Sequence, residues 1–250
     1  MSLTRRNLLL GAGALLAWPA RGLSFGAASR VDVAELDLGA GSLSRPDAWK
    51  RLLYDLVQST SVEAEPRSVW IKPDDVALFA HPFCVLLVDG GFAIPGDEAI
   101  EQLSQFLAYG GFLVIDDTTG GESKAADGAV RALVERLFPT RPLAPLPGDH
   151  PVHRAFFLLE GAPGRVDHAA WLEGVTVGNQ CPLIYCRNDL SGALDRDESG
   201  TYRYPCVPGG EAQRREAVKL GINLMMYALT SDYKNDQSHI RQLMLERRLK

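Results

Sequence analysis

Paired-cysteine motifs for zinc binding and thiol redox chemistry are missing from this sequence of 250 residues. It contains only four cysteines, and no two of them form a C-x-x-C pair, which excludes a zinc knuckle and a thioredoxin-type site. Cys84 lies within an apolar strand and is predicted to be a buried thiol. Cys181, Cys186 and Cys206 surround a loop-rich stretch, and in an oxidising compartment a disulfide among these three is compatible with that setting.

Excess basic charge and long apolar runs are also lacking. The chain has 26 Lys and Arg against 31 Asp and Glu, a net charge of −5, which argues against nucleic acid as a partner. Beyond the N-terminus no apolar run approaches the ~20 residues that a membrane span needs. The hydrophobic content of 46% is ordinary for a globular protein. We therefore expect one large α/β domain or two small ones.

The N-terminal stretch, MSLTRRNLLLGAGALLAWPARG, has the anatomy of an export signal. Arg5 and Arg6 precede a weakly hydrophobic stretch, 8–18, which is typical of a twin-arginine signal. We assign residues 1–28 to this signal and predict a periplasmic protein. The alternatives are a Sec signal that carries two arginines, or an uncleaved anchor that keeps the protein at the membrane.

Strands and helices alternate along the rest of the chain. The apolar runs FCVLLV and FLVIDD indicate buried parallel strands, and amphipathic patterns over 95–109, 127–138 and 211–229 indicate helices. Ser44 is predicted to cap an earlier helix. The pattern predicts a doubly wound α/β fold, with a mainly parallel sheet and helices on both faces. The domain is placed at 29–231, followed by a basic amphipathic helix at 232–250.

Two adjacent carboxylates, Asp116 and Asp117, end one of the predicted parallel strands. In doubly wound folds, ligands bind at the carboxyl ends of the strands. If both residues stay in the strand, their side chains point to opposite faces, and only one of them faces the crevice. A functional carboxylate there is a general base or a metal ligand. The structural alternative is a helix cap or a contact with the amides of the following TTGG turn.

Two further strand ends bring polar groups to the same edge of the sheet. Gly90 and Gly91 follow the strand at 83–88, and Arg187, Asn188 and Asp189 follow PLIYC. These residues are candidates for binding a polar ligand, although Asn and Asp also serve as turn residues without any ligand. The convergence of three polar strand ends favours a binding site.

Asp149, His150 and His153 form a third candidate group after the proline-rich loop. Two imidazoles three residues apart can share one face of a helical turn and bind a metal, with the carboxylate beside them. Pro151 pushes His150 toward extended geometry, which opposes a simple helical pair. In the alternative interpretation Asp149 caps a helix and His153 forms a hydrogen bond below it.

The stretch VLLVDGGFAIPGDEAIEQLSQFLAYGGFLVIDD resembles the central strand–helix–strand of class I glutamine amidotransferase-like proteins, including the ThuA-like branch. The ordered pieces LFAHPF, LPGDHPVHRAFF, IYCRNDLSGA, EAVKLGINLMMYALT and DYKNDQSHIRQLMLERR resemble the DUF4159 family over roughly residues 30–250. The resemblance implies a flavodoxin-like topology. Amidotransferases of this class place a nucleophilic cysteine just after the strand at 112–117. This chain has Asp116 and Asp117 there, so thiol-based amide hydrolysis is not expected.

Three functions follow as hypotheses. The first is an exported domain that binds a small polar ligand or a periplasmic partner at the strand-end crevice. The second is a metal-assisted hydrolase, carbohydrate-related by the ThuA-like resemblance, in which Asp116 or Asp117 acts with His150 or His153. The third is a scaffold that uses its surface and its C-terminal helix. The sequence identifies neither a cofactor nor a metal.

Overall fold

A computed structural model describes residues 31–248 of the chain, with side chains up to residue 230. The predicted export signal, 1–28, lies outside the described residues, so export stays a prediction. No helix in the described part is both long enough and apolar enough to cross a membrane.

The chain forms strands, α-helices and short 3-10 helices in alternation. In chain order these elements are β1 (Val31–Leu36), β2 (Ser42–Leu43), α1 (Pro46–Ser59), β3 (Ala64–Ile71), η2 (Val76–Ala80), β4 (Phe83–Val88), α2 (Asp97–Ala108), β5 (Phe112–Asp117), α3 (Lys124–Leu137), β6 (Ala144–Pro145), η3 (Pro151–Arg154), β7 (Glu173–Val177), β8 (Gln180–Cys186), α4 (Leu190–Leu194) and α5 (Gly210–Arg248).

All the strands belong to one sheet, in the order β3-β1-β4-β5-β8-β7-β6, with β2 paired to β4. The first five of these strands are parallel, whereas β7, β6 and β2 run antiparallel to their neighbours. The chain moves from β1 outward to β3 and then returns to β4 on the other side of β1. The gap between β1 and β4 is therefore the topological switch point. β2 borders it, because Ser42 pairs with Val88 at the end of β4.

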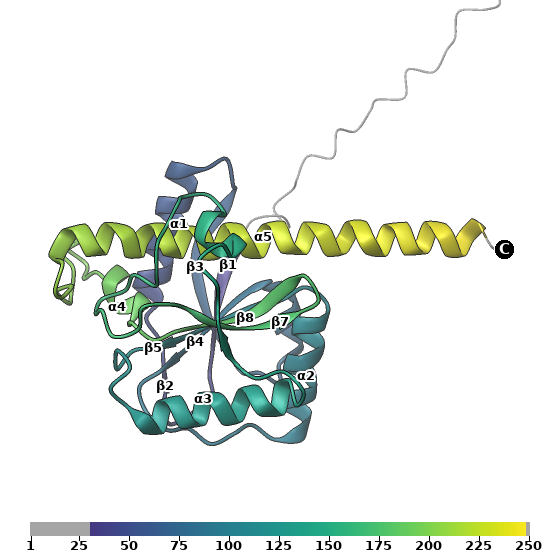
Figure 1. The fold of residues 1–250 in the computed structure, drawn as a ribbon, viewed down its shortest axis with the longest axis horizontal. Coiled ribbons are helices and arrows are strands. Elements are labelled where there is room, and N and C mark those ends of the chain that lie inside the picture. Colours follow the sequence, from purple (N-terminus) through teal and green to yellow (C-terminus); the bar gives the residue numbers. More distant parts are fainter. Residues whose placement is uncertain (1–30, 249–250) are drawn as a thin grey trace, which may run out of the picture. The chain divides into compact units, whose positions relative to one another are not determined.

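Helices cover both faces of the sheet (Figure 1). Residues of β5 alternate between two cores: Phe112 and Val114 join the core built with α1, α4 and α5, and Leu113 and Ile115 join the core built with α2 and α3. The central strands β4 and β5 are buried along their whole length, which explains their continuous apolar sequences. The predicted doubly wound, mainly parallel α/β fold is confirmed.

The cysteines depart from the disulfide expectation. Cys84 is a buried free thiol as predicted, but the other three are also free and buried. Cys181 and Cys186 stand at opposite ends of β8. Five residues of strand span about 17 Å, whereas the Cα atoms of a disulfide lie within about 7 Å of each other.

The last helix, α5, begins beside α4 and continues without interruption to Arg248. It contains the helix predicted over 211–229. It also passes through the predicted boundary between the domain, 29–231, and the basic helix, 232–250. The functional division at that boundary stays a prediction.

Candidate functional site

Asp116 and Asp117 end β5, and both side chains are fully buried. They continue the alternation of the strand, so Asp116 points into the layer of α1, α4 and α5, and Asp117 points into the layer of α2 and α3. The prediction that they face opposite sides is correct. Each carboxylate therefore belongs to a separate polar cluster.

The Asp116 carboxylate lies against the first turn of α4. It accepts hydrogen bonds from the backbone N–H groups of Leu190 and Ser191, both at 2.8 Å. These amides have no partner within the helix, because the first N–H groups of a helix lie before its hydrogen-bond ladder. Asp116 therefore caps a helix that begins 74 residues later in the chain.

Asp189, the residue before α4, supplies a second cap. Its carboxylate accepts from the Gly192 amide at 2.9 Å, and its backbone is left-handed with φ of 52°. No other non-glycine residue in the described part of the chain has a positive φ. A Cβ on Gly192 would lie 2.3 Å from the Asp189 carboxylate, so glycine is required there. Strain held by surrounding structure is typical of functional sites.

Two guanidinium groups converge on the Asp189 carboxylate. Arg45 Nη1 lies 2.5 Å from one carboxylate oxygen, and Arg165 Nε contacts the other. Arg45 also donates to the Ser191 hydroxyl at 3.0 Å and lies over the Tyr204 ring, 5.0 Å from its centroid. We call Arg45, Arg165, Asp116 and Asp189 the arginine–carboxylate cluster. It lies at the carboxyl ends of β5 and β8.

Arg45 reaches this cluster because of how α1 begins. Ser44 was predicted to cap α1, but the cap position is Arg45, which makes no side-chain cap bond. Pro46 at the helix start keeps the preceding residue out of helical geometry, which moves the cap to Arg45. The Arg45 amide donates to Glu35 at 2.7 Å, and its guanidinium is free to extend to α4. Burial raises the pKa of Glu35.

Burial and charge together shift the acidity of this cluster. Burial, with the Asp189 carboxylate beside it, raises the pKa of Asp116 to about 6, while the bonds from Ser191 and the charge of Arg45 oppose the rise. The Arg45 and Arg165 side chains remain 13% and 23% exposed, above carboxylates that are at most 1% exposed. The two carboxylates of the cluster are thus buried, and its two guanidinium groups are partly exposed to solvent.

Asp117 has a different set of partners on the other face. It accepts from the backbone N–H of Thr119 at 3.0 Å and from its hydroxyl at 2.6 Å, which closes the turn after β5. The Tyr185 hydroxyl lies 3.5 Å from the second carboxylate oxygen. Burial, followed by the nearby Asp117 charge, raises the pKa of Tyr185.

The Arg187 side chain lies on the α3 side, away from the arginine–carboxylate cluster. Its guanidinium stands 3.7 Å from Asp127 and 3.6 Å from Glu173. Arg131 of α3 binds the same two carboxylates more closely, at 2.9 and 3.1 Å. Arg187 therefore connects β8 to α3 and β7.

Asn188 holds the loop 161–170 in place. Its side-chain oxygen accepts from the amides of His168 and Ala169, at 3.0 and 2.8 Å. Its side-chain NH₂ donates to the Ala162 and Ala169 carbonyls, at 2.6 and 2.8 Å. Because these contacts use both ends of the amide, Asn188 fixes the loop that carries Arg165.

Gly90 and Gly91 lie at the carboxyl end of β4, the same edge of the sheet as Asp116 and Asp117. The amide of the preceding residue, Asp89, donates to the Gly41 carbonyl at 3.2 Å. The loop after β1 therefore passes against this strand end, as expected from the topology.

His150 and His153, by contrast, belong to a turn beside the amino-terminal end of β5. The His150 ring packs on Tyr227, with centroids 5.5 Å apart, and Tyr227 in turn packs on Phe112, the first residue of β5. The Tyr227 hydroxyl accepts from the Cys181 amide near the start of β8. The structure does not bring these histidines to the strand-end aspartates.

The predicted trio of Asp149, His150 and His153 is a turn rather than a ligand set. His150 Nδ1 accepts from the Val152 amide at 3.3 Å and caps η3, while Asp149 is exposed. His153 is buried, and burial lowers its pKa. Among the described residues, no three His, Cys, Asp or Glu side chains are grouped as the ligands of a metal would be.

Sequence reasoning missed Arg45, Arg165, Glu35 and Ser191, which complete the strand-end site. A signal for Arg45 was present: it stands between a glycine loop and a helix-starting proline, at the switch point of the fold. Arg165 carries no comparable local signal, because its position depends on Asn188 and on the loop that Asn188 holds.

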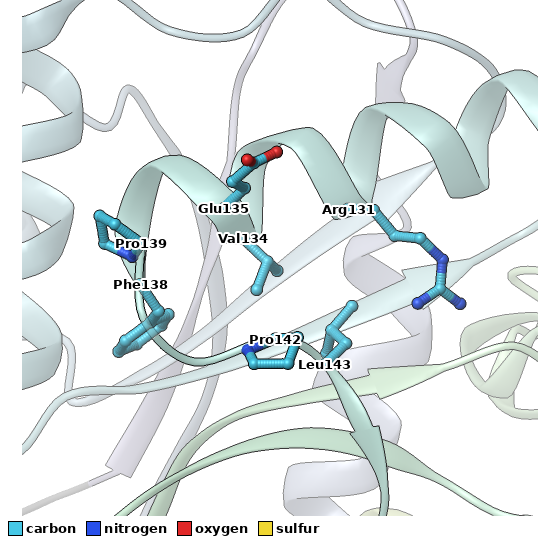
Figure 2. Close-up of a pocket in the computed structure, with 7 residues that line it drawn as sticks. All are labelled: Arg131, Val134, Glu135, Phe138, Pro139, Pro142 and Leu143. Carbon is cyan, nitrogen blue, oxygen red and sulfur yellow. The ribbon is translucent and has the colours of Figure 1, made fainter.

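The described part of the chain also has surface hollows away from the strand ends. One of about 300 Å³ lies between α3 and the following loop, and Figure 2 shows Val134, Phe138 and Leu143 along it, with Arg131 at one end. None of the predicted site residues lines it. Another, of about 340 Å³, lies beside the start of α5.

A comparison with known protein families shows which family the chain belongs to. Residues 32–229 match the family described as domain of unknown function (DUF4159), and the chain belongs to this family. The match covers nearly all of the residues that the structure describes. No curated protein matches the chain.

Proposed function

We propose that the protein is an exported binding domain that holds a small anion at the arginine–carboxylate cluster. The ligand class is a molecule that bears a carboxylate or a phosphate group. The observation that carries the proposal is the convergence of Arg45 and Arg165 on the two oxygens of the buried Asp189. The finer fold assignment, to the class I glutamine amidotransferase-like group, is part of the proposal, as are twin-arginine export and a periplasmic location.

The geometry supports an anion because each guanidinium has donors left over. Arg45 uses Nη1 for Asp189, and Arg165 uses Nε, out of the five N–H donors that each guanidinium carries. Both side chains are partly exposed, so the remaining donors are open to solvent. Arginine forks of this kind bind carboxylate and phosphate oxygens in pairs. The Arg45 guanidinium stacks over the Tyr204 ring, which restricts its orientation.

Charge in the cluster also favours an anion under mildly acidic conditions. Two guanidinium charges face two carboxylates, so the cluster is neutral when both carboxylates are ionised. The pKa of Asp116 is raised to about 6, so this carboxylate is protonated under mildly acidic conditions. The cluster of two arginines and two carboxylates then has a net positive charge. We therefore expect tighter anion binding at pH 5.5 than at pH 7.5.

The cysteines support a function without thiol catalysis. All four are buried free thiols. Burial raises the pKa of Cys181 to about 12 and raises the pKa of Cys84, Cys186 and Cys206 as well. Because the thiolate is the nucleophile, thiols with raised pKa values are poor catalysts.

The alternative of a metal-assisted hydrolase has less support. It needs Asp116 or Asp117 to act with His150 or His153, and these pairs lie at opposite ends of β5. About four strand residues, or 13 Å, separate the two ends. No observation in the described chain favours this second function over anion binding.

The test is calorimetric titration of the chain from residue 29 with inorganic phosphate and, separately, with malonate at low ionic strength. We expect saturable one-to-one binding of at least one probe, weakened about tenfold in Arg165→Gln. Arg165 is the better choice for substitution because Arg45 still pairs with Asp189 when Arg165 is changed.

Arg136→Gln is the matched control. Arg136 is an exposed arginine on α3 that pairs with Asp97, and its loss should leave probe affinity unchanged. Wild-type protein that shows no saturable heat with either probe up to about 10 mM would overturn the proposal. Equal weakening by both arginine substitutions would show general charge attraction rather than a site.

A further inference from the structure

Helix α5 continues beyond the residues whose side chains the structure describes. It runs from Gly210 to Arg248, and its described side chains, which end at residue 230, pack in the core as far as Leu229. The 18 residues that follow extend the helix by about 27 Å. We call residues 231–248 the tail. An isolated helix of this length is marginal in water unless one of its faces is packed.

The sequence of the tail predicts what such packing would contact. Ile240, Leu243 and Leu245 supply apolar residues, and Arg241 and Arg247 supply positive charge among them. The whole tail carries four basic and three acidic side chains, but in residues 241–248 the balance is three basic to one acidic. The rest of the described chain has the opposite balance: residues 31–230 carry 17 basic and 28 acidic side chains. The end of the tail therefore matches an acidic surface with exposed apolar groups.

Such a surface lies beside the start of α5. The hollow of about 340 Å³ is lined by Glu160, Asp167 and Glu216 and by no basic residue. Glu160 and Asp167 have no ion-pair partner among the described side chains, whereas Glu216 pairs with Lys219 at 2.7 Å. We call this the acidic hollow.

Exposed apolar side chains flank the acidic hollow along the chain. Leu158, two residues before Glu160, is 86% exposed, and Trp171, next to the lining residue Ala170, is 53% exposed. Phe156 is a third exposed apolar residue in the same loop. Exposed apolar groups beside a charged rim are typical of protein–protein interfaces.

The tail of a chain cannot reach its own acidic hollow. Glu216 lines the hollow from the first turns of α5, and Arg241 stands 25 residues later in the same uninterrupted helix. That separation is about 37 Å. A second copy, turned end for end, brings its tail to the hollow without bending the helix.

We propose that the protein forms a two-fold dimer in which the tail of each copy docks on the acidic hollow and the flanking Leu158 and Trp171 of the other. A two-fold axis makes the two contacts identical, so each tail and each hollow is used once and the assembly closes. The acidic hollow and the anion site share the loop 161–170, but no residue of the arginine–carboxylate cluster lines the hollow. The acidic body also disfavours the main competing role for a basic helix, attachment to an anionic membrane surface.

The first test is sedimentation equilibrium of the chain from residue 29. We expect a dimer whose dissociation constant rises about tenfold or more in Leu158→Ser and in Leu243→Ser, and rises with salt. Val76→Ser, at a similarly exposed apolar residue of η2, is the matched control and should leave the dimer unchanged. Because Leu158 is almost fully exposed, its substitution tests association without disturbing the core.

A charge-exchange experiment identifies the occupant of the hollow. One variant reverses the tail, with Arg241→Glu and Arg247→Glu, and another reverses the hollow, with Glu160→Lys and Asp167→Lys. Each variant alone should be monomeric, because both of its contacts become repulsive. An equimolar mixture should dimerise, because one contact is then doubly reversed and the other is wild type.

Three outcomes overturn the proposal. One is a wild-type chain that stays monomeric up to about 100 μM, a concentration that reveals interfaces of micromolar affinity. Another is a dimer that both charge reversals leave intact, which would place the interface elsewhere. The third is sedimentation of the monomer with vesicles of anionic lipid, which would assign the tail to a membrane surface instead.

Discussion

Asp116 and Asp117 are neighbours of the same residue type, and both are fully buried, yet their surroundings differ. Asp116 caps α4, a helix that lies far along the chain, and shares its space with the carboxylate of Asp189 and two guanidinium groups. Asp117 binds Thr119, two residues away, and closes a local turn.

The difference shows that position on the strand decides the role of each carboxylate. Because side chains alternate along a strand, Asp116 points into the layer that contains the switch-point loop and α4, and Asp117 points toward α3. The first layer brings Arg45 and Arg165 from distant segments to the Asp189 carboxylate. In the second layer Arg131 and Arg187 pair with Asp127 and Glu173 rather than with Asp117. A ligand site is therefore expected on the Asp116 side, and a structural turn on the Asp117 side.

The largest expected effect is on stability, and it separates the two aspartates. Asp116→Ala leaves two buried amide groups of α4 without an acceptor and should lower the free energy of unfolding by about 3 kcal/mol, after relief of repulsion with Asp189. Asp117→Ala loses contacts within a turn and should cost about half as much. Urea denaturation of both variants at pH 7 measures the difference.

Asp116→Asn is the matched control for this experiment. The amide keeps one acceptor oxygen for α4 and removes the buried charge, so its cost should be smaller than that of Asp116→Ala. Equal costs for the alanine variants at the two positions would contradict the comparison.

The second prediction concerns pH. Burial raises the pKa of Asp116 from the ordinary 3.8 to about 6, so between these values the folded chain holds a proton that the unfolded chain has released. The free energy of unfolding should therefore fall as pH rises through that window, by on the order of 2 kcal/mol from this residue.

The measurement is the difference between the stability curves of wild type and Asp116→Asn from pH 4 to pH 7. Burial also raises the pKa of Glu35 and Asp195, but these groups contribute to both curves and cancel in the difference. Asp117→Asn should keep the wild-type slope. A wild-type curve parallel to that of Asp116→Asn would show that Asp116 does not titrate in this range.

Much of this comparison could be predicted from the sequence. The apolar runs of β4 and β5 indicate central parallel strands, and strand alternation alone places Asp116 and Asp117 on opposite faces. The carboxyl-end location of Gly91 and Asn188 follows from the same topology. These features depend on local pattern, which a sequence carries directly.

The partners of Asp116 could not be predicted because they depend on contacts between distant segments. Arg45 meets Asp189 across 144 residues, and Arg165 depends on a loop held by Asn188. His150 was grouped with the aspartates from its residue type and its spacing to His153, neither of which reports position in the fold. Its packing against Tyr227 of α5 places it at the other end of the sheet.

A smaller effect is expected from the turn that serves Asp117. The Thr119 hydroxyl donates to Asp117 and also accepts from the Ser123 amide at 3.1 Å, next to the start of α3. Thr119→Val keeps the shape and removes both bonds, and should cost about 1 kcal/mol in urea denaturation. It should leave the pH dependence of Asp116 unchanged. A shift in that dependence would show that the two clusters are coupled.

The smallest effect is expected from Tyr185→Phe. The Tyr185 hydroxyl lies 3.5 Å from Asp117, at the outer limit of a hydrogen bond, whereas the contacts of Thr119 are much shorter. Removing the hydroxyl should change the free energy of unfolding by less than about 0.5 kcal/mol, because the carboxylate keeps its turn partners. A loss above about 1 kcal/mol would mean that Asp117 depends on a cross-strand partner as Asp116 depends on α4, and the contrast between a long-range and a local carboxylate would not hold.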